Sequence, residues 1–321
     1  MALAYHLALG GTRVTFYVRP SRVAGFPKSR LLYCYEDAST RTVENCDVVG
    51  AMSDVQQRTF DFVVVTLDGP ACRSVEGATL LAELADAIRA SDAVMILCGV
   101  SLGLHEYALR TTGLSPSRVR LGTLAYLAHE TTLQMPDHPA IDTKAMARAD
   151  FAYSHDTDRT GFTLARSAKA PAQRFAELIE QAGVERCAIV SPSFYAVFTA
   201  VFYPFIVASK LGGWLDADRL EGEPELVSLG VAAMKEIAGS PGFGPMGRRV
   251  AAALSESLVI GMYRASSEGF RPLDLATFNR HHHGGKVLEQ GIAVLRDSRQ
   301  AKAVAGHLTP ALDELLRRHD A

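Results

Sequence analysis

The stretch "ALAYHLALGGTRVTFYVRP", residues 2–20, reads as a helix followed by a strand. Its apolar residues up to Leu9 fit one side of a helix, and Gly10-Gly11 favours the backbone conformation in which helices end. Residues 14–18 are β-branched or aromatic, which is a strand pattern, and Arg19 follows them. A helix leading to a strand that ends in a basic residue is typical of the second part of a nucleotide-binding βαβ unit.

The rest of the first half continues this alternation after a polar region that extends to about Thr59. Residues 61–67 and 93–97 are nearly continuous apolar runs, as in the buried strands of parallel sheets, and residues 80–90 have helical spacing between them. Further strands are expected at residues 119–128, 151–154 and 160–167. The pattern predicts an α/β fold, a Rossmann-like doubly wound parallel sheet, over residues 1–188.

The second half has helical periodicity throughout, with breaks rich in proline and glycine such as "GSPGFGPMG", residues 239–247. Helices are expected at residues 175–182, 194–211, 226–238, 248–264, 287–305 and 311–318. We therefore expect an all-helical C-terminal domain over residues 189–321.

Composition excludes several classes of protein. The 321 residues carry a net charge of −2, so no basic excess indicates nucleic acid as a partner. The five cysteines are widely spaced, which is typical of free thiols in a reducing cytoplasm. No signal peptide is evident, and the apolar run at residues 194–208 is interrupted and too short to span a membrane.

Four motifs follow one another along the chain: "AYHLALGGTRVTFYVRP", "FDFVVVTLDGPA", "AVMILCGVSLG" and "GHLTPALDELL". In this order they resemble the ketopantoate reductase (2-dehydropantoate 2-reductase) family. The first is similar to the family's first helix and second strand, the second to its fourth strand and the following loop, the third to its fifth strand and loop, and the last to its closing segment. The resemblance implies a cytoplasmic, homodimeric, NADP-dependent oxidoreductase with a small-molecule substrate. The helical domain would bind substrate and form the dimer.

The glycine-rich turn of this family, G-x-G-x-x-G, would end directly before Met1. That turn brings the backbone close to the cofactor's pyrophosphate at a helix N-terminus. The first strand and the turn are absent from the chain as written, and two explanations stay open, a start assigned too far downstream and a real loss. If the truncation is real, we expect NADP to bind weakly or not at all.

The remaining cofactor positions agree only in part with the family pattern. Arg19 and Arg22 are placed to bind the 2′-phosphate of NADP, although a solvated surface role is the alternative. Asp68, after Leu67, stands where the family usually has a lysine, and a carboxylate near a phosphate is unfavourable. Cys98-Gly99 stands where the family usually has Asn-Gly.

The catalytic helix departs further from the family. Counting back from Pro204, Tyr195 stands at the position of the family's catalytic lysine and Thr199 at that of its asparagine. A tyrosine can donate a proton to a developing alkoxide, with Thr199 to orient it. The alternative is that Tyr195 packs in an aromatic face with Phe198, Phe202 and Phe205.

A polar segment near the C-terminal end replaces the family's substrate-binding glutamate. Its candidate residues are Asn279, His281, His282, His283 and Lys286. Consecutive histidines on a helix point in directions about 100° apart, so they cannot all bind one metal, and no metal is expected. Surface or helix-start packing, and one histidine facing the cleft between the domains, are the open alternatives, and Gly284-Gly285 would let two backbones or a ligand approach closely.

These residues predict an NADP-dependent reductase of a ketone or imine, with a substrate other than ketopantoate. The alternative is a non-redox enzyme or ligand-binding protein that reuses the fold after losing its cofactor-binding and catalytic residues.

Overall fold

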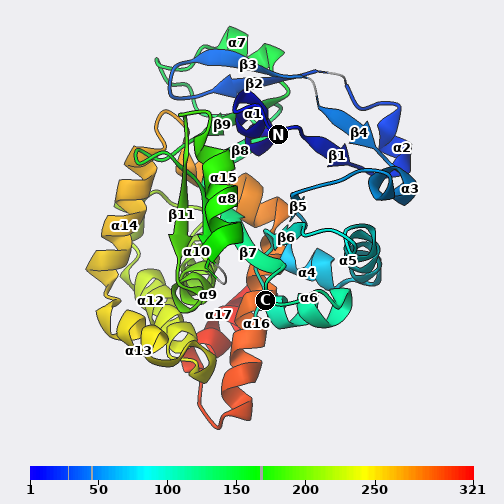
Figure 1. The fold of residues 1–321 in the computed structure, drawn as a ribbon. Helices are drawn as coiled ribbons and strands as arrows, with labels where there is room; N and C mark the ends of the chain where they lie inside the picture. The colour runs from blue at the N-terminus through cyan, green and yellow to red at the C-terminus, as the bar shows by residue number, and fades with distance from the viewer. Residues whose placement is uncertain (28, 45, 167–168) are drawn as a thin grey trace. The chain divides into compact units, whose positions relative to one another are not determined.

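The computed structural model describes residues 1–27, 29–44, 46–166 and 169–321. The chain divides into two compact units (Figure 1). The first contains residues 1–67, 71–99 and 103–190, and the second contains residues 68–70, 100–102 and 191–321. Ser167, at the end of one expected strand, lies outside the described residues.

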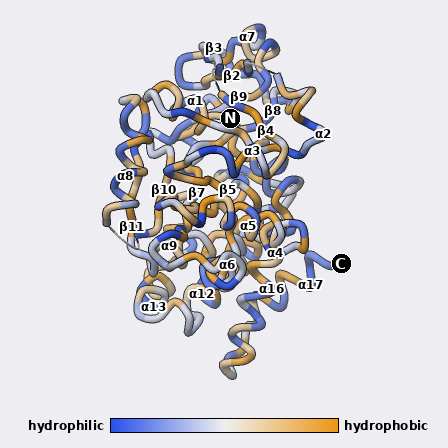
Figure 2. Tube along the Cα trace, turned by 45° about the vertical axis from the view of Figure 1, so that its right-hand side comes forward, coloured by the Kyte–Doolittle hydropathy of each residue, from blue (hydrophilic) through white to orange (hydrophobic). Residues whose placement is uncertain are grey.

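A five-stranded sheet forms the centre of the first unit, in the order β11-β10-β7-β6-β5. Its strands are β5 (Phe62–Val65), β6 (Val94–Leu97), β7 (Val119–Leu124), β10 (Thr160–Ala165) and β11 (Arg186–Val190). All neighbouring pairs are parallel except β7 and β10, which are antiparallel. The strands are largely apolar in Figure 2, and the predicted doubly wound parallel sheet is confirmed.

Helices pack on both faces of this sheet because successive side chains of a strand point to opposite sides. Met95 and Leu97 of β6 pack in one apolar cluster with α5 (Val75–Ala87) and α6 (Leu104–Thr112). The alternate residues Val94 and Ile96 pack in the other cluster with α1 (Ala2–Leu9) and α8 (Lys169–Glu180). Since all four residues of β6 are buried, the strand has no polar face, which explains its continuous apolar sequence.

Two further sheets were not expected. One pairs β1 (Thr15–Tyr17) with β4 (Asp47–Val49) in parallel. The other has the order β3-β2-β9-β8 and consists of β2 (Arg30–Cys34), β3 (Ser39–Val43), β8 (Leu127–Glu130) and β9 (Phe151–Ser154). The polar region before Thr59 thus contains a hairpin, and residues 151–154 lie in this second sheet rather than in the five-stranded one.

Short helices complete the first unit. They are α2 (Pro20–Val23), α3 (Met52–Gln56), α4 (Gly69–Arg73) and α7 (Thr143–Arg148). The first two residues of α4 belong to the second unit.

Residues 191–321 of the second unit are helical, as predicted, and residues 68–70 and 100–102 of the chain join them. Its α-helices are α9 (Pro192–Val201), α10 (Tyr203–Leu211), α11 (Ala217–Glu221), α12 (Pro224–Ala238), α13 (Gly244–Ala253), α14 (Glu256–Gly269), α15 (Leu275–His281), α16 (Leu288–Val304) and α17 (Pro310–Asp320). The 3₁₀ turn η1 (Pro241–Phe243) and the π-helical turn η2 (His282–Lys286) join neighbouring helices. Helices α10, α12, α16 and α17 form the core of the unit.

Two helices that the sequence predicts as continuous are each broken in the structure. Residues 194–211 divide into α9 and α10 at Phe202, close to Pro204, which cannot donate a backbone hydrogen bond. Residues 248–264 divide at Ser255, whose hydroxyl accepts a hydrogen bond from the N–H of Leu258 and caps α14. Local capping and proline chemistry therefore override the helical periodicity.

The apolar run at residues 194–208, expected to be too short to span a membrane, lies in the longer segment Pro192–Leu211, which by length and composition alone could cross one. In the structure 56% of its most apolar part is buried inside the protein. A helix buried in the core of a protein can have the same length and apolar composition, so the segment is weak evidence for a membrane span.

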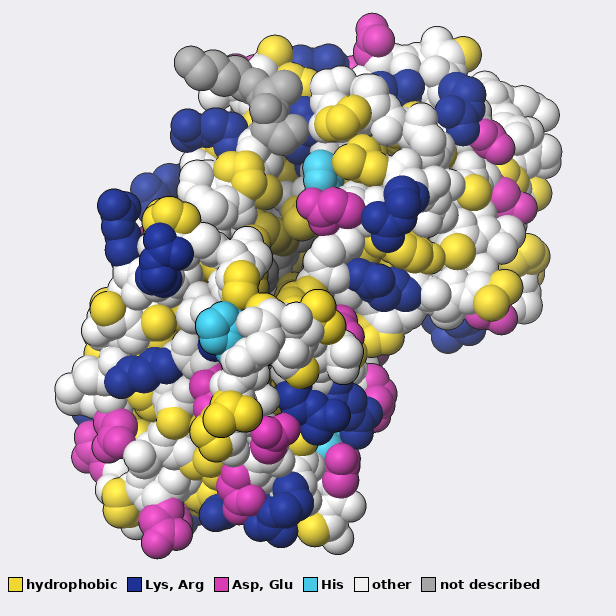
Figure 3. Space-filling view, turned by 90° about the horizontal axis from the view of Figure 1, so that it is seen from below, with side chains coloured by type: hydrophobic (Ala, Val, Ile, Leu, Met, Phe, Trp, Pro, Cys, Tyr) yellow, Lys and Arg dark blue, Asp and Glu magenta, His cyan; other side chains and the backbone are white. Residues whose placement is uncertain are grey.

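Positive and negative side chains are interspersed over the face shown in Figure 3.

Candidate functional site

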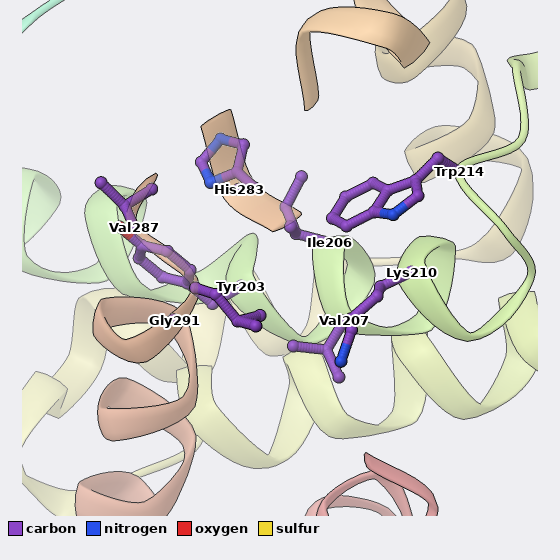
Figure 4. Close-up of a pocket in the computed structure, with 9 residues that line it drawn as sticks. Tyr203, Ile206, Val207, Lys210, Trp214, His283, Val287 and Gly291 are labelled. Atoms are coloured by element: carbon purple, nitrogen blue, oxygen red, sulfur yellow. The ribbon is translucent and has the colours of Figure 1, made fainter. Parts of the chain in front are cut away.

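A small cavity in the second unit lies between α10, η2 and the start of α16 (Figure 4). Its volume of about 10 Å³ is close to the smallest that holds one water molecule. It is lined by Tyr203, Ile206, Val207, Lys210, Trp214, His283, Val287, Leu288 and Gly291. Of the histidine run predicted from the sequence, His283 is the member that lines this cavity.

Glycines allow two aromatic rings to form the walls of the cavity. The ring of Trp214 lies against Gly284, where a Cβ atom would come within 2.7 Å of the ring. The ring of Tyr203 lies against Gly291, where a Cβ atom would come within 3.0 Å of it. The close approach expected at Gly284 is therefore made by a side chain of this chain.

Gln290, which the sequence analysis did not single out, connects three segments of this unit. Its Oε1 accepts hydrogen bonds from the N–H groups of Gly69 and Val100, at 2.9 and 2.8 Å. Its Nε2 donates to the hydroxyl of Tyr203 at 2.7 Å. Gln290 is only 7% exposed, and both ends of its amide are used. A single glutamine within a helix carries no spacing signal by which the sequence could identify it.

The hydroxyl of Tyr203 is in a low-dielectric environment. Burial raises its pKa, and the nearby charge of Asp68 raises it further, against the lowering effect of the hydrogen bond with Gln290. Tyr203 is therefore protonated at neutral pH. Because Asp68 acts on this group, the carboxylate at the family's lysine position lies near polar side chains of the helical unit.

The three consecutive histidines have different environments. His281 ends α15, whereas His282 and His283 belong to the π-helical turn η2. The ring of His282 stacks on Phe278 with 5.2 Å between centroids, and the ring of His283 lies edge-on to Tyr203 at 6.3 Å. Burial lowers the pKa of His282 to about 4 and that of His283 to about 3, so both are neutral at pH 7.

The other two candidates of this segment differ in burial. Asn279 is 5% exposed and hydrogen-bonds the side chain of Tyr263, so it is part of the core of the unit. Lys286 is exposed at the end of η2.

Tyr195 lies on the buried side of α9 and is 3% exposed. The hydroxyl of Thr199 donates to the main-chain oxygen of Tyr195 at 2.9 Å, so its proton is used within the helix. A separate row of rings runs along the same helix: Phe194 and Phe198, both exposed, stack on each other, and Phe198 meets Phe202 edge-on. Tyr195 and these phenylalanines therefore lie on different faces.

Of the residues predicted to bind the cofactor, Asp68 belongs to the second unit and the others lie at two places in the first unit. Arg19 and Arg22 are exposed at the start of α2, directly after β1, and neither forms an ion pair with any residue that the structure describes. Leu67 follows β5, and Cys98-Gly99 follows the neighbouring strand β6. Burial raises the pKa of Cys98 to about 12, so its thiol is neutral.

Comparison with known proteins identifies the architecture. No protein-family model and no curated protein sequence matches the chain. Among solved structures, 2-dehydropantoate 2-reductase from Geobacter metallireducens is similar over 99% of this chain and 94% of that one, with a TM-score of 0.65 and 15% identity. The dimeric ketopantoate reductase from Staphylococcus aureus is similar over 98% of this chain and 92% of that one, with a TM-score of 0.59 and 14% identity.

D-Mandelate dehydrogenase, solved with NADH and anilino(oxo)acetate, is also similar, with a TM-score of 0.58 and 13% identity over 99% of this chain and 92% of that one. At these identities the likeness establishes the fold. The chain therefore has the ketopantoate reductase fold, as the sequence motifs predicted.

Proposed function

We propose that the chain is a nicotinamide-dependent reductase that converts a ketone or imine to the corresponding alcohol or amine. The observation that carries this proposal is the structural likeness over almost the whole chain to enzymes described as 2-dehydropantoate 2-reductases and a mandelate dehydrogenase. The residues that replace the family's lysine, asparagine and glutamate favour a substrate other than ketopantoate.

The described residues fit a dinucleotide in one respect that can be tested. Arg19 and Arg22 present two exposed cations without an ion-pair partner in the described part of the chain, which suits an anionic group such as a 2′-phosphate. We therefore propose NADP as the cofactor, although the mandelate dehydrogenase structure contains NADH.

The bound cofactor would supply hydride to the carbonyl or imine carbon. The chain itself must then protonate the oxygen or nitrogen on which negative charge develops. We assign this role to the Tyr195 hydroxyl, which burial on α9 keeps away from bulk water. Thr199 would fix the helix turn that carries Tyr195, through its hydrogen bond to the main-chain oxygen.

Calorimetric titration with NADPH and NADH tests the cofactor proposal. We expect NADPH to bind more tightly, because the 2′-phosphate adds charge-assisted hydrogen bonds to the arginines. Equal or tighter binding of NADH would contradict the assignment of Arg19. Failure to detect either dinucleotide would favour the second candidate function.

A ligand-binding or non-redox role is that second candidate, and one observation favours it. The N–H groups of Gly69 and Val100, in the loops to which the family resemblance assigns cofactor contacts, already donate to Gln290. In a protein that has lost its cofactor, these backbone N–H groups would need hydrogen-bond acceptors from the protein itself. Protection of the chain against thermal unfolding by keto acids without any effect of NADPH would support this role.

We also propose a cytoplasmic homodimer. The five cysteines are all free in the structure, which suits a reducing compartment. One structural neighbour is described as dimeric. Light scattering coupled to size exclusion measures the mass directly, and a monomer at micromolar concentration would contradict the dimer.

A further inference from the structure

Three ligand-type side chains from distant parts of the sequence meet in the first unit. His6 lies on α1, His155 follows β9, and Glu185 precedes β11. The ligand atoms of the three residues all lie within 4.8 Å of one another, and His155 Nε2 is 3.6 Å from Glu185 Oε1. His6 Nδ1 faces the same carboxylate oxygen. Their exposures are 0%, 4% and 3%, so the cluster is inside the protein.

The facing atoms of this cluster make no hydrogen bonds in the structure. His6 Nδ1, His155 Nε2 and both carboxylate oxygens of Glu185 are buried without a hydrogen-bond partner. Buried polar atoms are nearly always hydrogen-bonded, and an uncompensated buried carboxylate is among the most unfavourable groups in a protein interior.

Both histidines are oriented by a second group at the other ring nitrogen. His6 Nε2 lies 3.4 Å from the hydroxyl of Tyr153, and His155 Nδ1 lies 3.3 Å from Glu36 Oε1. Metal-binding histidines commonly have such a partner, because it fixes the tautomer and the ring orientation. The arrangement leaves exactly one nitrogen of each ring to face Glu185.

We propose that His6, His155 and Glu185 bind one divalent transition-metal ion, zinc being the best match. Two imidazole nitrogens and a carboxylate suit zinc and related metals rather than calcium or magnesium, which prefer oxygen ligands.

A cavity of about 220 Å³ borders the cluster through His155. It is also lined by Tyr5, Cys34, Glu36, Asp37, Arg41, Tyr153, Arg159 and Val184. Three protein ligands leave one position of a tetrahedral ion for water or a small ligand, as in zinc sites that keep an open position. The neighbouring thiol of Cys34 donates a hydrogen bond to Glu36 Oε2 at 2.6 Å, so we do not count it as a ligand.

Gly161 of β10 makes room for the carboxylate of Glu185. A Cβ atom at this position would overlap the carboxylate group. A side chain here would therefore displace Glu185 from the two histidines, and Gly161→Ala is expected to weaken metal binding without removing any ligand.

The test is metal titration of the chelator-treated full chain with Zn²⁺, in comparison with Glu185→Gln and His155→Gln. We expect one saturable equivalent of zinc per chain by elemental analysis, a raised melting temperature, and at least a tenfold loss of affinity in either variant. Co²⁺ in place of Zn²⁺ should give the visible absorption bands of a tetrahedral site. His129→Gln is the matched control, because His129 is equally buried in the same unit but hydrogen-bonds Tyr35 outside the cluster.

Glu185→Gln also separates the two physical accounts of the cluster. If no ion binds, loss of a buried charge should leave the protein equally or more stable, and zinc should not change its melting temperature. If zinc binds, this variant should lose the stabilisation by zinc that the parent shows. Absence of a saturable equivalent in the parent, or equal zinc affinity in parent and both variants, would overturn the proposal.

Discussion

The histidines of the molecule occur in two contrasting arrangements. His282 and His283 are adjacent in the sequence, and their rings meet edge-on with centroids 5.0 Å apart, beside Phe278 and Tyr203 respectively. His6 and His155 are far apart in the sequence, yet their rings stack with centroids 5.1 Å apart beside Glu185. Both pairs have rings in contact, but the first pair lies against aromatic rings, whereas the second lies against a carboxylate.

The two regions also differ in how their polar atoms are satisfied. Around His283, glutamine and tyrosine side chains complete one another's hydrogen bonds, as at Gln290 and Tyr203. Around Glu185, the facing atoms have no hydrogen bond at all. We therefore expect proton transfer to respond to changes at Tyr195 in the helical unit, and metal binding to respond to changes around Glu185 in the first unit. The predictions below test this separation.

The largest effect is expected for Tyr195→Phe. If its hydroxyl donates the proton, turnover should fall by about 10²–10⁴-fold, the usual contribution of a general acid. Steady-state kinetics with NADPH measures this, and zinc content should not change. Tyr263→Phe is the matched control, since it removes another buried hydroxyl of the same unit, and it should keep near-normal turnover. Unimpaired turnover in Tyr195→Phe would limit Tyr195 to a packing role.

Arg19→Ala should weaken NADPH binding by roughly 1.5–3 kcal/mol and leave NADH binding unchanged, because one charge-assisted contact to the 2′-phosphate is lost. Calorimetry with both dinucleotides gives the difference. Arg13→Ala is a suitable control, because Arg13 is also exposed but precedes β1, whereas Arg19 follows it. A similar loss of affinity for NADPH in both variants would indicate a general effect of charge.

Glu36→Gln should lower zinc affinity by about 10–100-fold, the usual effect of a lost partner of a ligand histidine. Glu36 faces His155 Nδ1 and does not belong to the three ligands. Competition titration with a chromophoric chelator measures the affinity. Glu44→Gln, on the exposed carboxylate after β3, is the control. Equal affinity in Glu36→Gln and the parent would remove this residue from the site.

The smallest effect concerns the acid stability of the helical unit. The pKa of His283 in the folded chain, about 3, is below its value near 6.5 in the unfolded chain, so the unfolded chain takes up the proton first as the pH falls. The free energy of unfolding is therefore lower at pH 5.5 than above pH 6.5, by about 1 kcal/mol. Urea unfolding at pH 7.5 and 5.5 should show a smaller loss in His283→Gln, and His307→Gln, at an exposed site, should behave as the parent. An identical pH dependence in all three proteins would contradict the assignment.

The sequence predicts the fold well where elements are long or continuously apolar. Residues 61–67 and 93–97 contain β5 and β6, because burial on both faces requires an apolar residue at every position. The hairpin of β2 and β3 was missed because its strands are short and carry polar residues such as Arg41 and Thr42. Such strands are stabilised by tertiary pairing, which local patterns do not record.

The candidate site could be predicted only in part. His283 was identified because the run of histidines is conspicuous, and it does line a cavity. Gln290 was missed because its importance comes from partners distant in sequence, Gly69 and Val100. The cluster around Glu185 was missed for the same reason. A sequence shows a characteristic spacing of metal ligands only when the ligands lie on one helix or loop, and these three residues do not. The roles of Tyr195 and Arg19 stay predictions.

The measurement that tests the proposed reductase most directly follows the hydride itself. NADPH carrying deuterium at C4 of the nicotinamide would be incubated with the protein and a panel of 2-oxo acids, ketones and imines. We predict deuterium on the former carbonyl or imine carbon of a product, at a rate at least 10²-fold higher for the parent than for Tyr195→Phe. No transfer to any member of the panel above the rate without protein, in a preparation shown by calorimetry to bind NADPH, would contradict the proposed reductase.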